Sequence, residues 1–138
     1  MKSHTPESLS SLRQTITEHM TEEGYRPSLN ADGEIMFRFE GKTCYLQTSE
    51  KDHDALRIVI VNFHPLKTKA DREKATVAAQ EATASTKVVK IFTLDDDTWC
   101  VVELLMPEPE RFPEILSRTL SAIRAGLASF SKTLAAQG

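Results

Sequence analysis

The chain has 138 residues and a mass of 15.4 kDa, with 40% hydrophobic residues, 27% charged residues and a formal net charge of −3. This length can bury one hydrophobic core, and the composition is that of a globular protein, not a disordered one. The charge offers no basic face to nucleic acid, and no stretch approaches the roughly 18 apolar residues of a membrane span. We therefore expect one domain, residues 1–138, in the cytoplasm, with no nucleic-acid or membrane partner.

The first predicted element is a helix that begins at Thr5 and Pro6. A side-chain acceptor followed by proline suits the free N–H groups at a helix start. Apolar residues then recur at spacings of three and four and form one buried stripe, made of Leu9, Leu12, Ile16 and Met20. Gly24 is expected to end the helix in a left-handed conformation.

From Tyr25 the apolar period changes to two, which predicts strands. Residues 30–33 (NADG) suit a three-residue hairpin loop closed by Gly33, and residues 40–42 (EGK) suit a second turn. With this pairing, Phe37 and Phe39 share a face with Cys44 and Leu46. The opposite face then carries Met36, Arg38 and Tyr45.

The middle of the chain predicts a buried strand and then a helix. The run LRIVIVNF, residues 56–63, leaves neither face polar, as is typical of a central strand. A helix follows from about Thr68, with Asp71 as the acid of a capping box. Its apolar stripe is weak and rich in alanine, and we expect it to consist of Ala70, Val77, Ala78 and Ala82.

Residues 87–106 predict a hairpin, and a long amphipathic helix follows from Pro109. A four-residue loop from Asp95 to Thr98 would place Phe92 opposite Val101 and Lys90 opposite Glu103. The element order is then α-β-β-β-β-α-β-β-α. We expect an α+β fold, with an antiparallel sheet of about five to six strands and helices mainly on one face.

Residue types that could carry chemistry do not form a recognisable site. Cys44 and Cys100 lie in strand-like runs and are expected to be reduced, buried thiols, too few for a zinc site. His53 and His64 lie at strand ends and share no helix face. The acid run at residues 95–97 lacks the alternating ligands and central glycine of a calcium loop. We therefore predict no catalytic residue, no cofactor and no metal.

The most informative surface is the sheet face opposite the helices. A bare face of this kind would be an apolar patch rimmed by charge, which usually marks a partner. An alternative is that the alanine-rich helix crosses over and buries it. Alternation places Val88 and Leu105 on this face together with eight partner-binding candidates, Met36, Arg38, Tyr45, Lys90, Phe92, Trp99, Val101 and Glu103.

Three segments carry a resemblance to a known family: GYRPSLNADGEIMFRFEGKTCYL (residues 24–46), LRIVIVNF, and KVVKIFTLDDDTWCVVELL (residues 87–105). Together they resemble the YbjN-like bacterial proteins, whose sheet domain is similar to type III secretion chaperones. The resemblance spans nearly the whole chain in order. It implies a single YbjN-like domain with a chaperone-like fold, frequent homodimers and no established catalytic residue. The alanine-rich middle helix and His64 depart from the family's pattern.

These observations favour a non-catalytic protein-binding module, chaperone-like or an adaptor. We expect a homodimer, a separate protein partner, or both. The alternative function is a small-ligand-binding or enzymatic domain, with a pocket between the C-terminal helix and the sheet.

Overall fold

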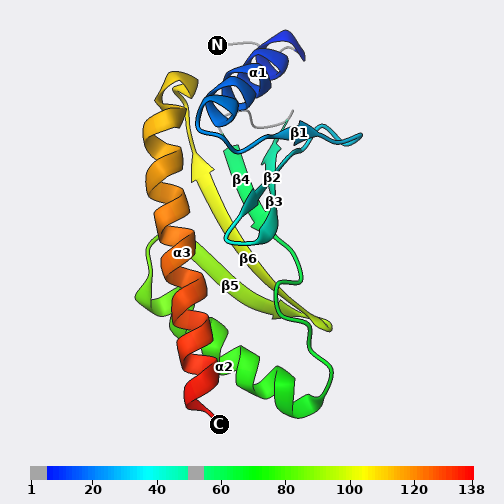
Figure 1. The fold of residues 1–138 in the computed structure, drawn as a ribbon, viewed down its shortest axis with the longest axis vertical. Helices are drawn as coiled ribbons and strands as arrows, with labels where there is room; N and C mark the ends of the chain where they lie inside the picture. Colours follow the sequence, from blue (N-terminus) through cyan, green and yellow to red (C-terminus); the bar gives the residue numbers. More distant parts are fainter. Residues whose placement is uncertain (1–5, 50–54) are drawn as a thin grey trace. The chain divides into compact units, whose positions relative to one another are not determined.

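The computed structural model describes residues 6–49 and 55–138, with side chains from residue 12 onward, and Figure 1 shows the fold. Thr5 and His53 lie outside the described residues, as does the side chain of Leu9. The elements in chain order are α1 (Pro6–Glu22), β1 (Ser28–Leu29), β2 (Ile35–Phe39), β3 (Lys42–Thr48), β4 (Ala55–Ile60), α2 (Lys69–Ser85), β5 (Val89–Leu94), β6 (Asp97–Leu105), the short 3-10 helix η1 (Pro109–Arg111) and α3 (Phe112–Ala136).

The six strands form one sheet in the order β1-β2-β3-β4-β6-β5, and the β1–β2, β2–β3 and β5–β6 pairs are antiparallel. The predicted α+β class, the order of the elements and the antiparallel sheet are confirmed. The chain divides into two compact units. The first unit holds Met1–Ile58 and Glu103–Ser117, and the second holds Val59–Val102 and Arg118–Gly138. That all 138 residues form one domain stays a prediction.

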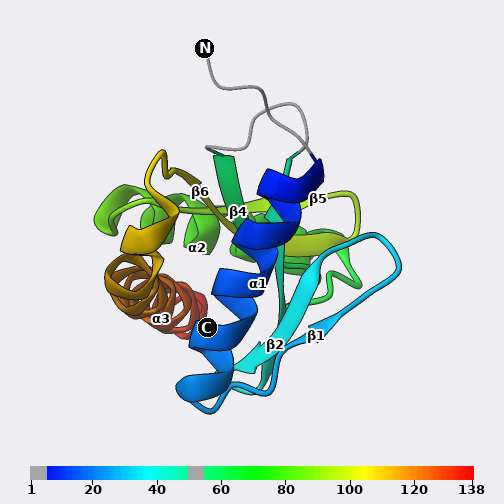
Figure 2. The same cartoon turned by 90° about the horizontal axis from the view of Figure 1, so that it is seen from above.

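In the first unit, α1 lies against the β1–β2 hairpin (Figure 2). Gly24 ends α1 as expected, with φ of +88°, while the N–H of Tyr25 donates to the carbonyl of Met20 at 3.0 Å. Gly33 closes the hairpin loop at φ +80°. A Cβ on Gly33 would lie 2.8 Å from Nη2 of Arg13 on α1, so only glycine leaves room for this guanidinium.

The predicted parity of the first-unit strands is confirmed. Phe37 lies opposite Cys44 and Ile35 opposite Leu46, and all four side chains are buried. Met36 lies opposite Tyr45 on the other face, and both are half-buried. The loop between these strands is Glu40-Gly41, in which both residues have positive φ, as a tight two-residue hairpin turn requires.

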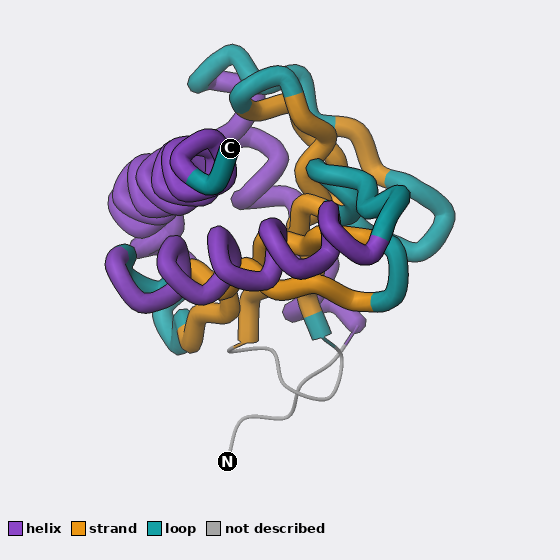
Figure 3. Tube along the Cα trace, turned by 90° about the horizontal axis from the view of Figure 1, so that it is seen from below, coloured by secondary structure: helices purple, strands orange, loops and turns teal. Residues whose placement is uncertain are grey.

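In the second unit, α2 and α3 lie side by side (Figure 3). Gln137 donates to the carbonyl of Lys74 at 2.9 Å, and the Ser85 and Ser129 hydroxyls are 3.3 Å apart. The capping box of Thr68 and Asp71 is confirmed. The predicted α2 stripe is only half right, because Val77 and Ala70 are exposed and the buried face is Ala75, Ala78, Ala79 and Ala82.

The predicted register of the β5–β6 hairpin is wrong by two residues. Phe92 lies opposite Trp99 and Lys90 opposite Val101, so Lys90 and Glu103 are not direct cross-strand neighbours. The loop is the two-residue turn Asp95-Asp96, not a four-residue one. Aspartate tolerates the left-handed backbone region, and Asp95 has φ of +55°, which permits this shorter turn.

Candidate functional site: a half-exposed aromatic patch on the last hairpin

The β5–β6 hairpin has one face filled by α3. Val89, Ile91, Cys100 and Val102 are all buried on this face. A Cβ on Gly126 of α3 would lie 3.0 Å from Cγ1 of Val89, so the helix backbone approaches the strand closely there. This contact leaves no room for a ligand between α3 and the hairpin at Gly126.

The opposite face of the hairpin carries four side chains that we call the aromatic patch: Lys90, Phe92, Leu94 and Trp99. The rings of Phe92 and Trp99 are stacked, with centroids 6.2 Å apart and planes inclined by 24°. Both aromatic side chains are half-buried, while Lys90 and Leu94 are exposed. Stacked aromatics beside a cation are common in protein-binding surfaces.

Trp99 has one polar atom that the described residues do not satisfy. Its indole Nε1 is buried and has no hydrogen-bond partner among them. A buried donor without a partner costs about 1–3 kcal/mol, so tryptophan is a poor choice for a purely structural position here. Trp99 is not fully enclosed, because its side chain remains half-buried and its ring stacks on Phe92 of the neighbouring strand.

The free edge of β5 is closed by α2. The hydroxyl of Thr83 accepts the N–H of Ile91 at 2.9 Å and donates to the carbonyl of the same residue at 3.1 Å. These two groups are the ones that a further strand would otherwise use. The alanine-rich helix therefore closes this edge, contrary to the alternative in which it crosses the face bearing the aromatic patch.

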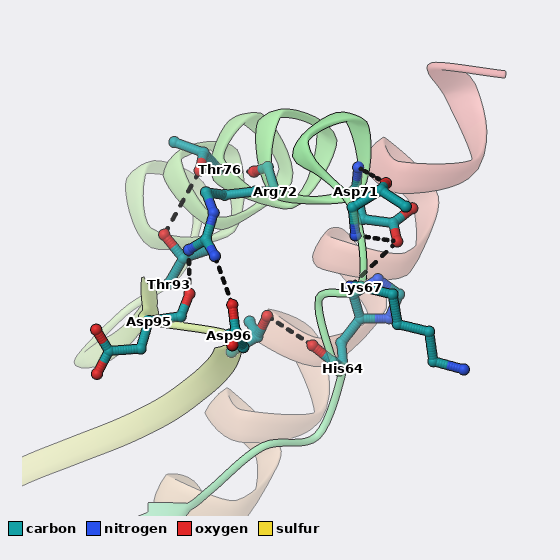
Figure 4. Close-up of polar contacts among 10 residues, drawn as sticks. His64, Lys67, Asp71, Arg72, Thr76, Thr93, Asp95 and Asp96 are labelled. Atoms are coloured by element: carbon teal, nitrogen blue, oxygen red, sulfur yellow. Dashed lines mark hydrogen bonds and ion pairs between the residues drawn. The ribbon is translucent and has the colours of Figure 1, made fainter.

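The tip of the hairpin is fixed by contacts from outside it (Figure 4). The guanidinium of Arg72 donates to the Asp95 carbonyl and to the Asp96 carboxylate, the latter at 2.7 Å. The buried Thr98 hydroxyl donates to the His64 carbonyl at 2.9 Å. The aromatic patch therefore stands on a hairpin that is held at both its edge and its tip.

The remaining candidates fall into different environments. Val101 was predicted to be a partner contact, but it is 1% exposed, so the face that carries the aromatic patch is covered at this position. Glu103 is exposed. Arg38 is exposed as well, and its guanidinium donates to Thr43 Oγ1 at 2.9 Å and to the Gly41 carbonyl at 2.6 Å.

Sequence reasoning missed a polar network on the same strand face as Met36 in the first unit. Glu34 accepts hydrogen bonds from Asn30 at 2.9 Å and from Gln47 at 2.5 Å, and Arg57 donates to Gln47 at 3.3 Å. Gln47, Arg57 and Glu103 line a cavity of about 350 Å³. The cross-strand pair Glu34 and Gln47 follows from the confirmed register, but Arg57 joins only through a neighbouring strand.

The thiols and histidines in the described part of the chain are in packing positions. Burial raises the pKa of Cys44 to about 12, with the nearby charges of Arg38 and Lys42 opposing that rise. Both Cys44 and Cys100 are buried and form no disulfide, as predicted. His64 packs edge-on against Phe130 at 5.4 Å. Among the described residues no three metal-ligating side chains come together, and no helix is long and apolar enough to cross a membrane.

Two solved structures have a similar fold. YbjN from E. coli, described as a putative transcription regulator, matches with a TM-score of 0.59 and 12% sequence identity, over 90% of this chain and 92% of that one. The Yersinia pestis type III secretion chaperone SycH, in complex with a stable fragment of YscM2, matches with a TM-score of 0.52 and 10% identity, over 81% of this chain and 96% of that one. No family model and no curated protein sequence matches.

These comparisons confirm the likeness that the sequence predicted, to YbjN and to a type III secretion chaperone. At 10–12% identity they show the fold alone. Neither neighbour is described as an enzyme, and one of them is described with a bound protein fragment.

Proposed function

We propose that the chain is a non-catalytic protein-binding module, chaperone-like or an adaptor, that acts in the cytoplasm as a homodimer through the aromatic patch. The observation that carries this proposal is the half-exposed Phe92–Trp99 stack on a hairpin whose other face is already filled. A partner that covers the stack would remove apolar surface from water.

The likeness to SycH supports protein binding as the function class, because that chaperone is described in complex with a fragment of YscM2. The Cys44 thiol is unsuited to nucleophilic catalysis, which supports a non-catalytic role for that residue. A thiol whose pKa is about 12 stays protonated near neutral pH, and only the thiolate is a nucleophile. The first-unit candidates Met36, Arg38 and Tyr45, and Glu103 of β6, stay predicted partner contacts.

The proposal is tested with Phe92→Glu. Placing a carboxylate on the stack makes its burial against a second copy unfavourable, while the half-buried position lets the monomer fold. We expect light scattering to give a dimer mass for the wild-type protein and a monomer mass for the variant, with unchanged circular dichroism. Val77→Glu is the matched control, since Val77 is an exposed apolar residue on α2 and the change should leave the dimer intact.

Trp99 provides a second readout, because it is the only tryptophan in the chain. Its emission should shift to the red on dilution of the wild-type protein, as the dimer dissociates and the ring meets water. In Phe92→Glu the emission should be the same at every concentration. A wild-type protein that is monomeric by mass, or a variant that keeps the dimer, would contradict use of this patch for self-association.

A further inference from the structure

A second cavity lies in the first unit, where β1 stops alongside β2. β1 has only two residues, Ser28 and Leu29, and is preceded by Pro27, which has no N–H to donate to a strand ladder. Arg26 has φ of +50°, so the chain turns away before it can pair with the rest of β2. The second half of β2 is left without an outer strand, and a cavity of about 420 Å³ occupies that place.

The cavity wall combines an apolar floor with two cations. Tyr25, Met36 and Phe37 supply the apolar part, and the rings of Tyr25 and Phe37 meet edge-to-face at 5.8 Å, which fixes the tyrosine. Arg26 and Arg38 supply the charge. The residues that line this cavity include no carboxylate, although the chain as a whole has a net charge of −3.

The two arginines differ in their hydrogen bonding. Arg38 is held by Thr43 Oγ1 and the Gly41 carbonyl, and these bonds use two of the five donors of a guanidinium. Arg26 is exposed and makes no hydrogen bond or ion pair with the described residues. It also adopts a left-handed backbone directly before a proline, where an extended one is favoured, and such strain is concentrated at ligand-binding sites.

We infer that this cavity binds a small organic anion with an aromatic body, a carboxylate or a sulfonate. The ring would lie against Tyr25 and Met36, and the anionic group would accept from Arg38, with Arg26 as the second cation. A guanidinium that is already oriented loses little freedom when it binds a carboxylate or sulfonate, which favours recognition through paired N–H groups. This inference does not depend on the proposed homodimer, because no residue of the aromatic patch lines this cavity and the partner is of a different class.

The test uses two probes with the same ring system. The anion is 1-anilinonaphthalene-8-sulfonate, and the neutral analogue is N-phenyl-1-naphthylamine. Isothermal titration of the full chain should show one anion site per chain, with at least about tenfold weaker binding of the neutral analogue, as expected when charge-assisted hydrogen bonds are lost. Equal affinities for the two probes, or no binding of the sulfonate, would overturn the inference.

Variants locate the site. Arg38→Gln should weaken sulfonate binding about tenfold, and Arg26→Gln, which removes no described contact, should weaken it less. Arg118→Gln is the matched control, an exposed arginine on α3 outside the cavity, and should change nothing. Because this dye also binds exposed apolar surface, Phe92→Glu is titrated in parallel. Loss of binding in Phe92→Glu but not in Arg38→Gln would overturn the inference and leave the proposed function untouched.

Discussion

The two faces of the β5–β6 hairpin differ in chemistry and in burial. The face under α3 carries Val89, Ile91, Cys100 and Val102, none more than 4% exposed. The other face carries the Phe92–Trp99 stack, which is half-buried, beside the exposed Lys90. Three aliphatic side chains and the Cys100 thiol line the filled face, and the aromatic pair beside a cation lies on the other one.

Side-chain burial in this hairpin therefore follows the chemistry of each side chain as well as its hydrophobicity. The rings of Phe92 and Trp99 are as apolar as many core side chains, yet they are only half-buried, and the Trp99 N–H, itself buried, has no partner among the described residues. Each face can therefore be tested by removing matched side chains from neighbouring positions and comparing the loss of stability with the loss of association.

The largest loss of stability is expected from Ile91→Ala, on the face of the hairpin that α3 fills. The change leaves a cavity beneath α3 and should lower the free energy of unfolding by about 2–5 kcal/mol. Phe92→Ala, one residue away on the open face, should cost less than about 2 kcal/mol, because the ring it removes is already half in water. Urea unfolding at low protein concentration measures both. Equal losses would mean that the aromatic patch belongs to the core of its own chain.

Sequence reasoning could predict the faces of this hairpin but not its register. Strand alternation has a period of two, so the two-residue error left Lys90, Phe92 and Trp99 on the correct face while changing every cross-strand neighbour. The register depended on whether Asp95 could take a positive φ, as it does, with its carbonyl accepting from Arg72, 23 residues earlier.

The candidate site residues show a second limit of prediction from sequence patterns. Val101 is 1% exposed although strand alternation places it on the same face as Phe92 and Trp99, so its burial comes from tertiary packing and not from any local pattern. The cavity beside Arg26 and Arg38 could not be predicted from the sequence either. It exists because β1 stops after two residues, whereas the alternation from Tyr25 gave no sign of such a short strand.

A smaller loss of stability is expected from a substitution at the outer edge of β5, where Thr83 of α2 binds the strand. Thr83→Val keeps the shape of the side chain but removes the hydroxyl that pairs with the N–H and carbonyl of Ile91. We expect a loss of about 1–3 kcal/mol, together with a greater tendency to aggregate through the opened edge. Thr83→Ser keeps the hydroxyl and serves as the control. Hydrogen exchange of the Ile91 amide reports on the edge directly, and unchanged protection in Thr83→Val would contradict this role for α2.

The smallest effect is expected where α2 begins, and it depends on pH. The backbone N–H of Lys67 is the main cause that lowers the pKa of Asp71, and Thr68 contributes through its own N–H and hydroxyl. The unfolded chain therefore binds the proton first as the pH falls. The stabilisation by the charged carboxylate is complete above the unfolded pKa, about 3.9, and is lost as the pH falls through the lower folded value.

Asp71→Asn should accordingly reduce the difference in urea midpoint between pH 6 and pH 3. Glu73→Gln, in the same helix turn with only an exposed partner at 4.0 Å, should leave that difference close to that of the wild-type protein. An Asp71→Asn variant with the full wild-type acid sensitivity would show that the start of α2 contributes nothing charge-dependent to the edge it covers.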